Sequence, residues 1–502
     1  MNHNLYAIFA ARFLRRPDHA CLMLDNGCAW SYRDIERASA KLANLLLALG
    51  LQPGDRIAVQ VDKSPEALVL YLASLRAGTV FLPLNPAYTQ AEIEYFLNDA
   101  QPGLFVCRPQ FREAALLLAA QSGVAHTLAL DENGRGSLID LAAAQSDVFE
   151  TVPRRPEDLA AILYTSGTTG RSKGAMLTHG NLASNAEALC QAWQFTSDDV
   201  LLHMLPLFHI HGLFVACNCT LLAGSAMLFE ARFDARRAVE LLPQASLFMG
   251  VPTYYTRLLA EPSFTRKCAR DVRLFVSGSA PLLAETFTAF AQRTGQRILE
   301  RYGMTEGGMY TSNPYTGDRR CGSVGPALHG VDLRVVDEAG QACAVGVAGN
   351  IQVRGPNIFA GYWRMPEKTA EEFTADAYFR TGDVGHLDKD GYLFISGRAR
   401  DLIISGGLNV YPKEIEDVID ALPGVAESAV VGLPHADFGE AVTAVVVAKP
   451  GAQLDEGAII AAVRERLAGF KVPKQVYIVA DLPRNAMGKV QKAVLRTQYA
   501  KP

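Results

Sequence analysis

Helical and strand patterns of apolar and polar positions alternate over residues 31–110. The segment "SYRDIERASAKLANLLLALG" has a helical pattern, with Ser31 and Asp34 at its start and Gly50 at its end. This predicts a helix that begins with a capping pair and stops at a glycine. A second helical segment, "SPEALVLYLASLRAG", has Pro65 near its start and Gly78 at its end. The neighbouring segments "QPGDRIAVQVD" and "TVFLPLN" predict strands.

The order strand, helix, strand predicts a parallel sheet that is covered by helices on both faces. The pattern resumes in "VLLHMLPLF" (residues 200–208), "ASLFMGV" and "VRLFVSGSAP". From about residue 331 it changes to short strands and tight turns, as in "VDLRVVDEAGQ", "GNIQVRGPN" and "GYLFISGR". These later segments predict a β-rich subdomain.

The segment after Arg398 forms a separate pattern. Strands "ESAVVGL" and "AVTAVVVAK" and the helix "EGAIIAAVRERLAGF" predict a small α+β unit. We therefore expect an α/β protein with a large N-terminal domain, residues 1–399, that contains layered parallel-type sheets, helices and the β-rich subdomain. A small C-terminal domain, residues 400–502, is connected to it through a few residues, which suits a hinge.

Composition narrows the range of partners. The 502 residues are 49% hydrophobic and 20% charged, and the net charge of −4 argues against a broad nucleic-acid surface. No apolar run approaches the ~18 residues that a membrane span requires. The nine cysteines form no C-x-x-C motif, and an odd number in a long chain favours a reducing cytosol over disulfides or structural zinc. We expect a cytoplasmic protein that binds neither nucleic acid nor membrane.

A glycine- and hydroxyl-rich loop, "YTSGTTGRSKGAML" (residues 164–177), is the first candidate site. Such loops usually surround phosphate oxygens. The Walker A pattern, however, requires Gly-Lys followed by Ser or Thr, whereas here Arg171 follows Gly170, and Gly174 follows Lys173. If the loop binds phosphates, it belongs to another class of nucleotide site.

Five motifs together resemble the adenylate-forming superfamily, which includes acyl-CoA synthetases, firefly luciferase and peptide-synthetase adenylation domains. They are "TSGTTGRSKG", "RYGMTE", "YFRTGD", "GRARDLIISGG" and "PRNAMGK", in the order and spacing of that superfamily. The length of 502 residues alone would suggest roughly three domain-sized pieces. The resemblance implies instead a large N-terminal domain and a mobile C-terminal lid. It also implies that ATP is cleaved between its α- and β-phosphates, so that an acyl-adenylate and pyrophosphate form.

The resemblance assigns roles around the nucleotide. Glu306, with Thr165, would hold Mg²⁺; Thr305 would donate to the α-phosphate; Asp383 and Arg398 would contact the ribose. Asp383 alone would otherwise be interpreted as an ordinary turn acid. The implied ATP- and AMP-binding residues are Thr165, Ser166, Gly167, Thr168, Thr169, Gly170, Lys173, Ser279, Ala280, Arg301, Tyr302, Gly303, Thr305, Asp383 and Arg398.

The C-terminal domain carries the remaining implied roles. Lys489 matches the catalytic lysine, although composition alone would suggest one more solvated lysine in a basic tail. An acetyltransferase and deacetylase acting on it would provide a regulatory switch. Arg400 stands at the hinge position, and rotation about it would bring Ser405, Gly406 and Gly407 to a coenzyme A tunnel.

Two further segments bear on the acid that is activated, "PLFHIHGLF" and "MGVPTYYTRLL". A short diacid places its second carboxylate in a dry site, where it must be paired, and arginine suits that role. Arg257 is our candidate, with Ser279 adding a hydroxyl; a helix arginine that extends to solvent is the alternative. His209 and His211 have metal-like spacing on a predicted strand but lack further ligands. We therefore expect His209 at the pocket wall beside the reacting carboxylate and His211 behind it.

With "ERYGMTE" and "TSNPYTGDR", these segments look most like malonyl-CoA synthetases. The resemblance implies an ATP-dependent ligase that forms malonyl-CoA from malonate and coenzyme A and accepts methylmalonate as a second acid. Lys489, Thr305, Glu306 and His209 are its expected catalytic residues. The alternatives are a ligase for another short- or medium-chain acid or for a carrier protein, and a nucleotide-binding homologue without turnover.

Overall fold

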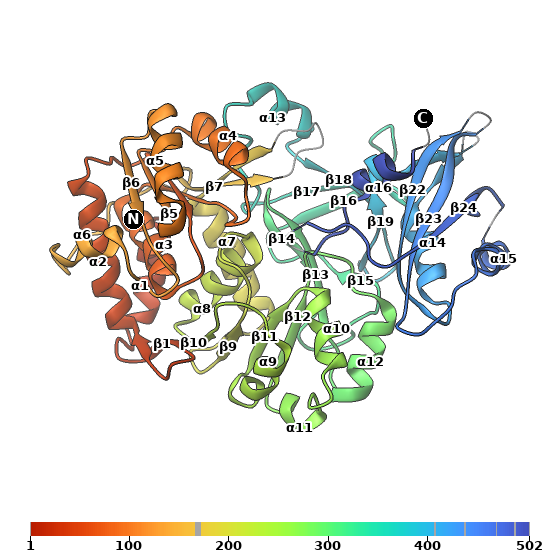
Figure 1. Cartoon of the computed structure of the whole chain (residues 1–502), viewed down its shortest axis with the longest axis horizontal. Coiled ribbons are helices and arrows are strands. Elements are labelled where there is room, and N and C mark those ends of the chain that lie inside the picture. Colours follow the sequence, from red (N-terminus) through yellow and green to blue (C-terminus); the bar gives the residue numbers. More distant parts are fainter. Residues whose placement is uncertain are drawn as a thin grey trace.

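The computed structural model describes residues 2–165, 172–405, 408–435, 438–467, 469–485 and 488–500. Within this part of the chain the strands form four sheets, three in a large lobe and one in a smaller C-terminal lobe, which is blue in Figure 1. The predicted α/β class is confirmed. No helix of the described residues is long and apolar enough to cross a membrane.

The first sheet has the strand order β6-β5-β3-β4-β7-β8. All neighbouring strands are parallel except β7 and β8, which flank the glycine-rich loop and are antiparallel. Its strands are β3 (Arg56–Gln60), β4 (Val80–Pro83), β5 (Leu104–Cys107), β6 (His126–Ala129), β7 (Leu159–Thr165) and β8 (Lys173–Thr178).

The second sheet has the order β14-β13-β12-β11-β9-β10-β1-β2 and is parallel from β13 to β1. Its strands are β1 (Ala20–Met23), β2 (Ala29–Ser31), β9 (Val200–His203), β10 (Ala226–Phe229), β11 (Leu247–Gly250), β12 (Leu274–Ser277), β13 (Leu299–Met304) and β14 (Gly308–Ser312).

Both helices predicted near the N-terminus are present. Ser31 and Asp34 form the capping box of α2, and Gly78, with φ of 72°, ends α3 in the left-handed conformation that glycine adopts without strain. The helices of this part of the chain are α1 (Leu5–Phe13), α2 (Tyr32–Ala48), α3 (Pro65–Ala77), α4 (Gln90–Ala100), α5 (Arg112–Gln121), α6 (Ser137–Ala143), α7 (His179–Ala192), α8 (Asn218–Ala223), α9 (Ala235–Leu241), α10 (Pro252–Ala260), α11 (Arg266–Ala269) and α12 (Ala284–Thr294).

Successive side chains along the strands point to opposite faces of a sheet and so belong to different hydrophobic cores. Leu201, Leu247 and Leu274 face a core that they share with α1, α2, α3, α7, α8 and the first sheet. The next residues, Leu202 and Phe248, face a separate core with α9 to α12. A third core lies on the outer face of the first sheet with α4 and α5. Because successive strand residues point to opposite faces, helices cover both faces of the first and second sheets.

The β-rich segment forms a third sheet, of order β15-β19-β18-β17-β16, in which all neighbours are antiparallel. Its elements are β15 (Ser323–Gly325), β16 (Asp332–Val336), β17 (Gly349–Arg354), α13 (Pro366–Glu372), β18 (Phe379–Leu387) and β19 (Leu393–Arg398).

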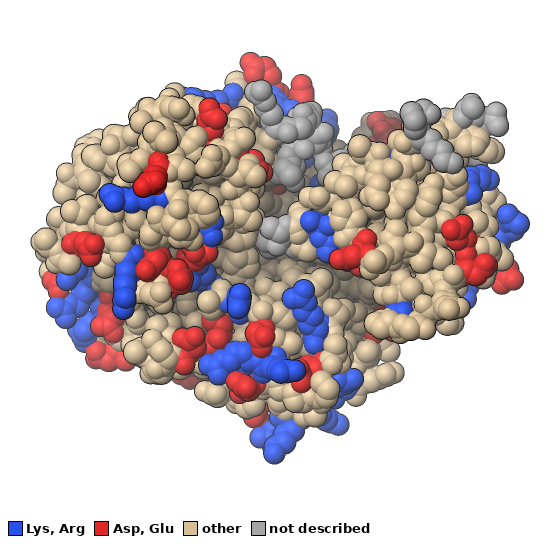
Figure 2. Space-filling view, viewed as in Figure 1, with Lys and Arg blue, Asp and Glu red and all other residues tan. Residues whose placement is uncertain are grey.

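From Ile403 onward the chain builds its own sheet and its own apolar clusters. The elements are β20 (Ile403–Ser405), β21 (Leu408–Val410), α14 (Pro412–Asp420), β22 (Val425–His435), β23 (Gly439–Ala448), α15 (Glu456–Arg466), β24 (Gln475–Val479) and α16 (Lys492–Tyr499). A groove separates this lobe from the large lobe, and acidic and basic side chains are interspersed over the face that Figure 2 shows.

Candidate active site

Several predicted site residues follow the carboxyl ends of parallel strands in the second sheet. The parallel strands β9, β11, β12 and β13 lead into His209, α10, Ser279 and Thr305, respectively. The carboxyl ends of parallel strands meet at one edge of a sheet, where α/β proteins bind their ligands. The topology therefore brings these distant segments together.

Tyr362 connects a lysine and a carboxylate that the sequence assigned to the triphosphate. The buried Nζ atom of Lys173 lies 4.6 Å from the centre of the Tyr362 ring and 3.7 Å from Oε1 of Glu372. The Tyr362 hydroxyl donates to Oε1 of Glu306 at 3.0 Å. Tyr362 thus contacts the Lys173 ammonium through its ring and the Glu306 carboxylate through its hydroxyl.

The glycine-rich loop itself lies largely outside the described residues. Thr165 is the last residue of β7, and its hydroxyl is 3.5 Å from the carbonyl oxygen of Lys173. Five of the predicted phosphate-binding residues are not described: Ser166, Gly167, Thr168, Thr169 and Gly170.

The oxygen groups near Glu306 fit a magnesium ion shared with phosphates. Glu306 is 6% exposed, and burial raises its pKa, so that its carboxylate gains from a cationic partner. Magnesium is usually bound by one or two carboxylates together with substrate phosphates and water. The described residues contain no group of three or more His, Cys, Asp or Glu that could hold a metal by themselves.

Asp383 accepts two charged or polar donors in a buried position. Nε of Arg398 lies 2.7 Å from Oδ1 of Asp383, and the Tyr302 hydroxyl donates to Oδ2. Asp383 is 4% exposed. A carboxylate has about four acceptor sites, so two donors leave room for two hydroxyls of a ribose. This geometry favours a binding role over that of a simple turn acid.

Arg301 lies fully inside the protein with donors that lack partners. Its side chain packs against Gly278 so closely that a Cβ there would lie 2.4 Å from Cζ of Arg301. Arg301 is 3% exposed, and burial lowers its pKa to about 10. Its Nε and Nη2 atoms have no hydrogen-bond partner among the described residues. A buried guanidinium without a partner is costly, and an anion would offset that cost.

The two histidines that follow β9, His209 and His211, are influenced by the positive charge of Arg301. Burial, together with the charges of Arg301 and Lys489, lowers the pKa of His209 to about 4. Burial and Arg301 also hold the pKa of His211 well below its usual value. Oγ of Ser279, whose φ is 72°, lies 3.3 Å from Nδ1 of His211. The charge of Arg301 thus helps to keep both imidazoles neutral.

The strand predicted for the two histidines is wrong. β9 ends at His203, and His211 begins a π-helical turn, His211–Cys217. The backbone N–H of His211 donates to Nδ1 of His209 at 3.2 Å, so the two rings do not form a metal pair on one strand face. Such turns are frequent at functional sites.

Arg257 does not occupy the dry position that we predicted for it. It lies on α10 with an exposed side chain, and among the described residues no carboxylate lies within ion-pair distance. Its charge acts on the neighbouring Tyr254, whose pKa burial nonetheless raises to about 12. The sequence predicted Arg257 in the acyl pocket, but the buried arginine at this edge of the second sheet is Arg301, which we had counted among the ATP- and AMP-binding residues.

The lid loop lies close to the second sheet. A Cβ on Gly488 would lie 3.8 Å from the side chain of Thr253 on α10. The charge of Lys489, whose side chain is exposed, contributes to the lowered pKa of His209. The backbone N–H of Lys489 donates to Oδ1 of Asn485 at 3.0 Å. Sequence order alone could not place this loop, because 280 residues separate Lys489 from His209.

The remaining predicted residues have less distinctive settings. Gly303 lies in β13, where a Cβ would be 1.9 Å from the carbonyl oxygen of Gly308, and Ala280 and Thr305 are half-buried. Ser405 is buried at the end of β20. Gly406, Gly407 and the side chain of Arg400 lie outside the described residues.

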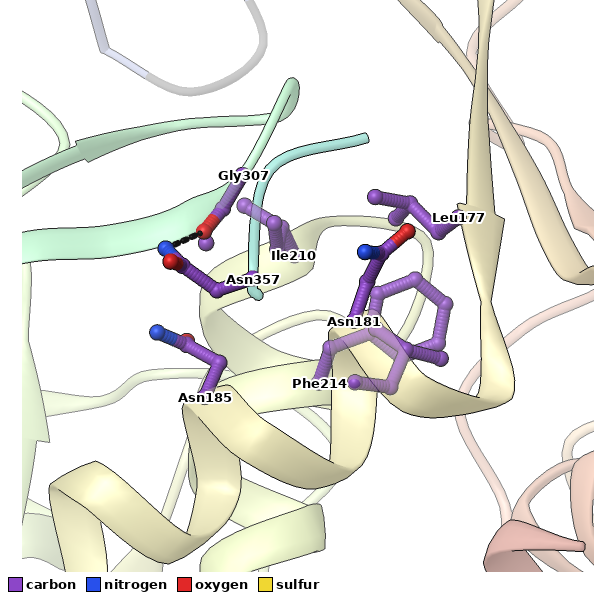
Figure 3. Close-up of a pocket in the computed structure, with 9 residues that line it drawn as sticks. Leu177, Asn181, Asn185, Ile210, Phe214, Gly307 and Asn357 are labelled. Atoms are coloured by element: carbon purple, nitrogen blue, oxygen red, sulfur yellow. Dashed lines mark hydrogen bonds between the residues drawn. The ribbon is translucent and has the colours of Figure 1, made fainter. Parts of the chain in front are cut away.

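The sequence analysis missed Tyr362 and three asparagines that surround the Glu306 turn. Figure 3 shows Asn181, Asn185 and Asn357 around a small cavity, with the amide of Asn357 bonded to Gly307. Tyr362 lies in "GYWRMPEKT", and an aromatic residue after a glycine carries no recognisable signal for a carboxylate partner.

Comparison with known proteins identifies two family models on this chain. The model described as AMP-binding enzyme matches residues 9–363, and the model described as AMP-binding enzyme C-terminal domain matches residues 414–489.

Curated relatives and solved structures match along almost the whole chain. Malonate–CoA ligase of Arabidopsis thaliana is 35% identical over 98% of this chain and 89% of its own length. Feruloyl-CoA synthase of an Amycolatopsis species is also 35% identical, over 97% and 98%. The ATP-bound crystal structure of MatB from Rhodopseudomonas palustris is 55% identical, covers 99% of both chains and has a TM-score of 0.97, against 0.87 for the apo form of MatB.

Proposed function

This chain belongs to the family of AMP-binding enzymes, and from that premise we propose that it joins malonate to coenzyme A in an ATP-dependent, AMP-forming reaction. ATP and coenzyme A are its co-substrates, and residues 1–399 and 400–502 are its two domains. Two relatives of equal identity, named for malonate and for ferulate, differ in their acids. Overall sequence similarity therefore does not identify the acid substrate, and the choice must be argued from the residues of the acyl pocket.

The observation that carries the choice of acid is the buried guanidinium of Arg301. Its Nε and Nη2 atoms have no partner among the described residues, and the side chain is 3% exposed. The planar fork of arginine matches a carboxylate in a bidentate manner. A monocarboxylic acid with an apolar chain would leave this charge buried without a partner. A short diacid would compensate it with its second carboxylate.

The reaction begins with the other carboxylate. One of its oxygens attacks the α-phosphorus of ATP, the bond from that phosphorus to the bridging oxygen breaks, and pyrophosphate leaves with the electron pair. Lys489, whose ammonium acts on His209, supplies a positive charge near the reacting oxygens. The neutral imidazole of His209 forms the wall beside them without adding a second charge.

Other residues hold the nucleotide. Asp383 accepts from the ribose hydroxyls, while Arg398 and Tyr302 keep its carboxylate in place. Lys173 adds a positive charge for the phosphates. Glu306 and Thr165 would hold Mg²⁺, which supplies charge neutralisation at the phosphate oxygens when bound.

The second half-reaction needs an approach for the thiol. The sulfur of coenzyme A attacks the acyl carbon, the bond from that carbon to the phosphate oxygen breaks, and AMP leaves. We assign Ser405, Gly406 and Gly407 to the pantetheine path and Arg400 to the hinge. Arg257, exposed on α10 one turn after Thr253, is suited to attracting anionic substrates to the entrance rather than to pairing inside.

The test is pyrophosphate release with a panel of acids at equal concentration: malonate, methylmalonate, succinate, acetate, octanoate and ferulate. We expect malonate to give the highest kcat/KM, with methylmalonate second. A preference for acetate, octanoate or ferulate would refute the diacid assignment. Product identification as malonyl-CoA by mass completes the experiment.

A further inference from the structure

The backbone of the turn that carries Thr305 and Glu306 is conformationally restricted. It joins the antiparallel strands β13 and β14, and the strand register shifts between Tyr302 and Gly303. Gly308 has φ of 67°, and a Cβ there would lie 2.3 Å from Oδ1 of Asn185. Such a turn requires glycine, but the hairpin alone does not determine where the turn lies relative to the strand that begins at Lys173.

Side chains from outside the hairpin bind the carbonyl and amide groups of this turn. Nδ2 of Asn357 donates to the carbonyl oxygen of Gly307 at 2.6 Å and lies 3.3 Å from that of Met309. The amide of Asn185 on α7 accepts from the backbone N–H of Met309 at 3.1 Å and donates to its carbonyl oxygen at 2.9 Å. Asn357 and Asn185 are 3% and 6% exposed.

A third asparagine connects this turn to the phosphate strand. Nδ2 of Asn181 donates to the carbonyl oxygens of Pro356 and Ile358, both at 2.8 Å, and so holds the segment that carries Asn357. Oδ1 of Asn181 accepts from the backbone N–H of Thr178, the last residue of β8, at 3.0 Å. Hydrogen bonds of Asn181 and Asn357, joined by the backbone of residues 356–358, therefore connect the end of β8 to the turn of Glu306.

All three side chains line one cavity of about 10 Å³, which Gly307 and Gly308 of the turn also line (Figure 3). They come from two helical positions of α7 and from the segment after β17. The backbone N–H of Phe359, next to that segment, also donates to the carbonyl oxygen of Glu306 at 2.9 Å. The carbonyl groups of Glu306 and Gly307 are thus both held by residues 357–359.

We propose that Asn181, Asn185 and Asn357 form a clamp that sets the position of the Glu306 carboxylate relative to Lys173, so that magnesium and triphosphate are bound in one geometry. They are positioning residues, because each acts on the turn of Glu306 through hydrogen bonds to backbone groups. The inference rests on the proposed function in that Glu306 holds the metal. Amides are needed at these positions because each must donate to a backbone carbonyl in a buried site, where a misplaced acceptor is costly.

The test compares Asn357→Asp with wild type in nucleotide binding without an acid substrate. The carboxylate has the same size as the amide but cannot donate to Gly307. Titration calorimetry would measure the affinity for ATP with Mg²⁺, for ATP with EDTA, and for AMP. We expect the gain in ATP affinity that Mg²⁺ gives to wild type to fall at least fivefold in the variant, with AMP affinity within twofold. The Mg²⁺ concentration for half-maximal pyrophosphate release should rise by a similar factor.

Asn350→Asp is the matched control. Asn350 lies on β17, seven residues earlier, and is half-buried; among the described residues its amide donates to Glu338 alone, at 3.3 Å. The variant should behave as wild type. If Asn357→Asp does not fold, Asn181→Asp replaces it. Aspartate retains the acceptor for Thr178 and removes the donations to Pro356 and Ile358, so the same selective loss is expected.

Three outcomes would overturn the clamp. One is an unchanged magnesium gain in the folded variant, and another is a parallel loss of AMP affinity, which a general folding defect gives. The third is the absence of a magnesium gain in wild type, which would also remove Glu306 as the metal ligand. Turnover with a different acid but not with malonate would reject only the substrate and leave the clamp intact.

Discussion

Replacing Arg301 with methionine should exchange the acid preference of the enzyme. The variant keeps much of the volume and removes the charge, which in the wild type is 3% exposed and has two donor atoms without partners among the described residues. With malonate bound, the second carboxylate would then be buried without its partner. Breaking a buried pair costs roughly 3–5 kcal/mol, which corresponds to about two to four orders of magnitude in kcat/KM for malonate.

The same substitution should stabilise the ligand-free protein. Burial lowers the pKa of Arg301 to about 10 from 12.5, which corresponds to a destabilisation on the order of 3 kcal/mol. Methionine removes this cost, so the thermal midpoint of the free variant should lie above that of wild type. Malonate should raise the midpoint of wild type and not that of the variant. A substitution that stabilises the free protein and lowers its activity is typical of a buried binding-site charge whose counter-charge comes from the ligand.

The assay is coupled pyrophosphate release with malonate and with acetate, combined with thermal unfolding of the free proteins. The activity with acetate, which has no second carboxylate, should change less than tenfold. Arg257→Met is the control, because this arginine is exposed and its loss should cost no more than about 1 kcal/mol. If Arg301→Met retains the wild-type ratio of malonate to acetate, the pairing is refuted. If Arg257→Met loses that ratio instead, the exposed arginine is the partner.

Two other predictions concern the lid and acid stability. Lys489→Ala should abolish pyrophosphate release but retain thioester formation from supplied malonyl-adenylate; equal loss of both half-reactions, measured separately, would contradict the assigned role. The folded-state pKa of the buried His179 is lowered to about 4, by burial first, from an unfolded value near 6.5. Its contribution to stability is therefore complete above pH 6.5 and is lost as the pH falls toward 4, by roughly 3 kcal/mol. In His179→Gln, denaturant unfolding at pH 7 and pH 4.5 should show a smaller decrease than in wild type, and an equal decrease would contradict the assignment.

Local chemistry made part of this structure predictable. The capping box of Ser31 and Asp34 and the left-handed Gly78 involve neighbours within a few residues, so the sequence contains all the information that places them. The buried parallel strands were recognisable for a similar reason, since continuous apolar runs between helices have few other structures available. The motif residues Asp383 and Glu306 were found by resemblance, and no pattern in their own neighbourhood would have identified them.

The parts that the sequence did not predict depend on long-range packing. Arg301 and Arg257 are both arginines beside apolar segments, but Arg301 lies in the buried strand β13 and packs against Gly278, whereas Arg257 is exposed on α10. Asn357 acts on Gly307, 50 residues away, and Asn185 acts on Met309, 124 residues away. An asparagine in a loop usually indicates a turn, so a pattern of residues cannot distinguish these buried amides from ordinary loop residues.

The position of the lid has a consequence for the order of the two half-reactions. With Gly488 beside Thr253, the Lys489 charge helps to keep His209 neutral in the pocket. Rotation about residue 400 would remove that charge once pyrophosphate has left, while Arg301 would continue to lower the pKa of His209. The exposed Lys449–Glu285 ion pair, at 2.6 Å, is the kind of contact between the lobes that contributes little free energy and therefore opposes such a rotation only weakly. If Lys489 and Arg301 have the roles proposed above, the lid would leave after the first step against little resistance from this ion pair, and the diacid would stay paired with Arg301.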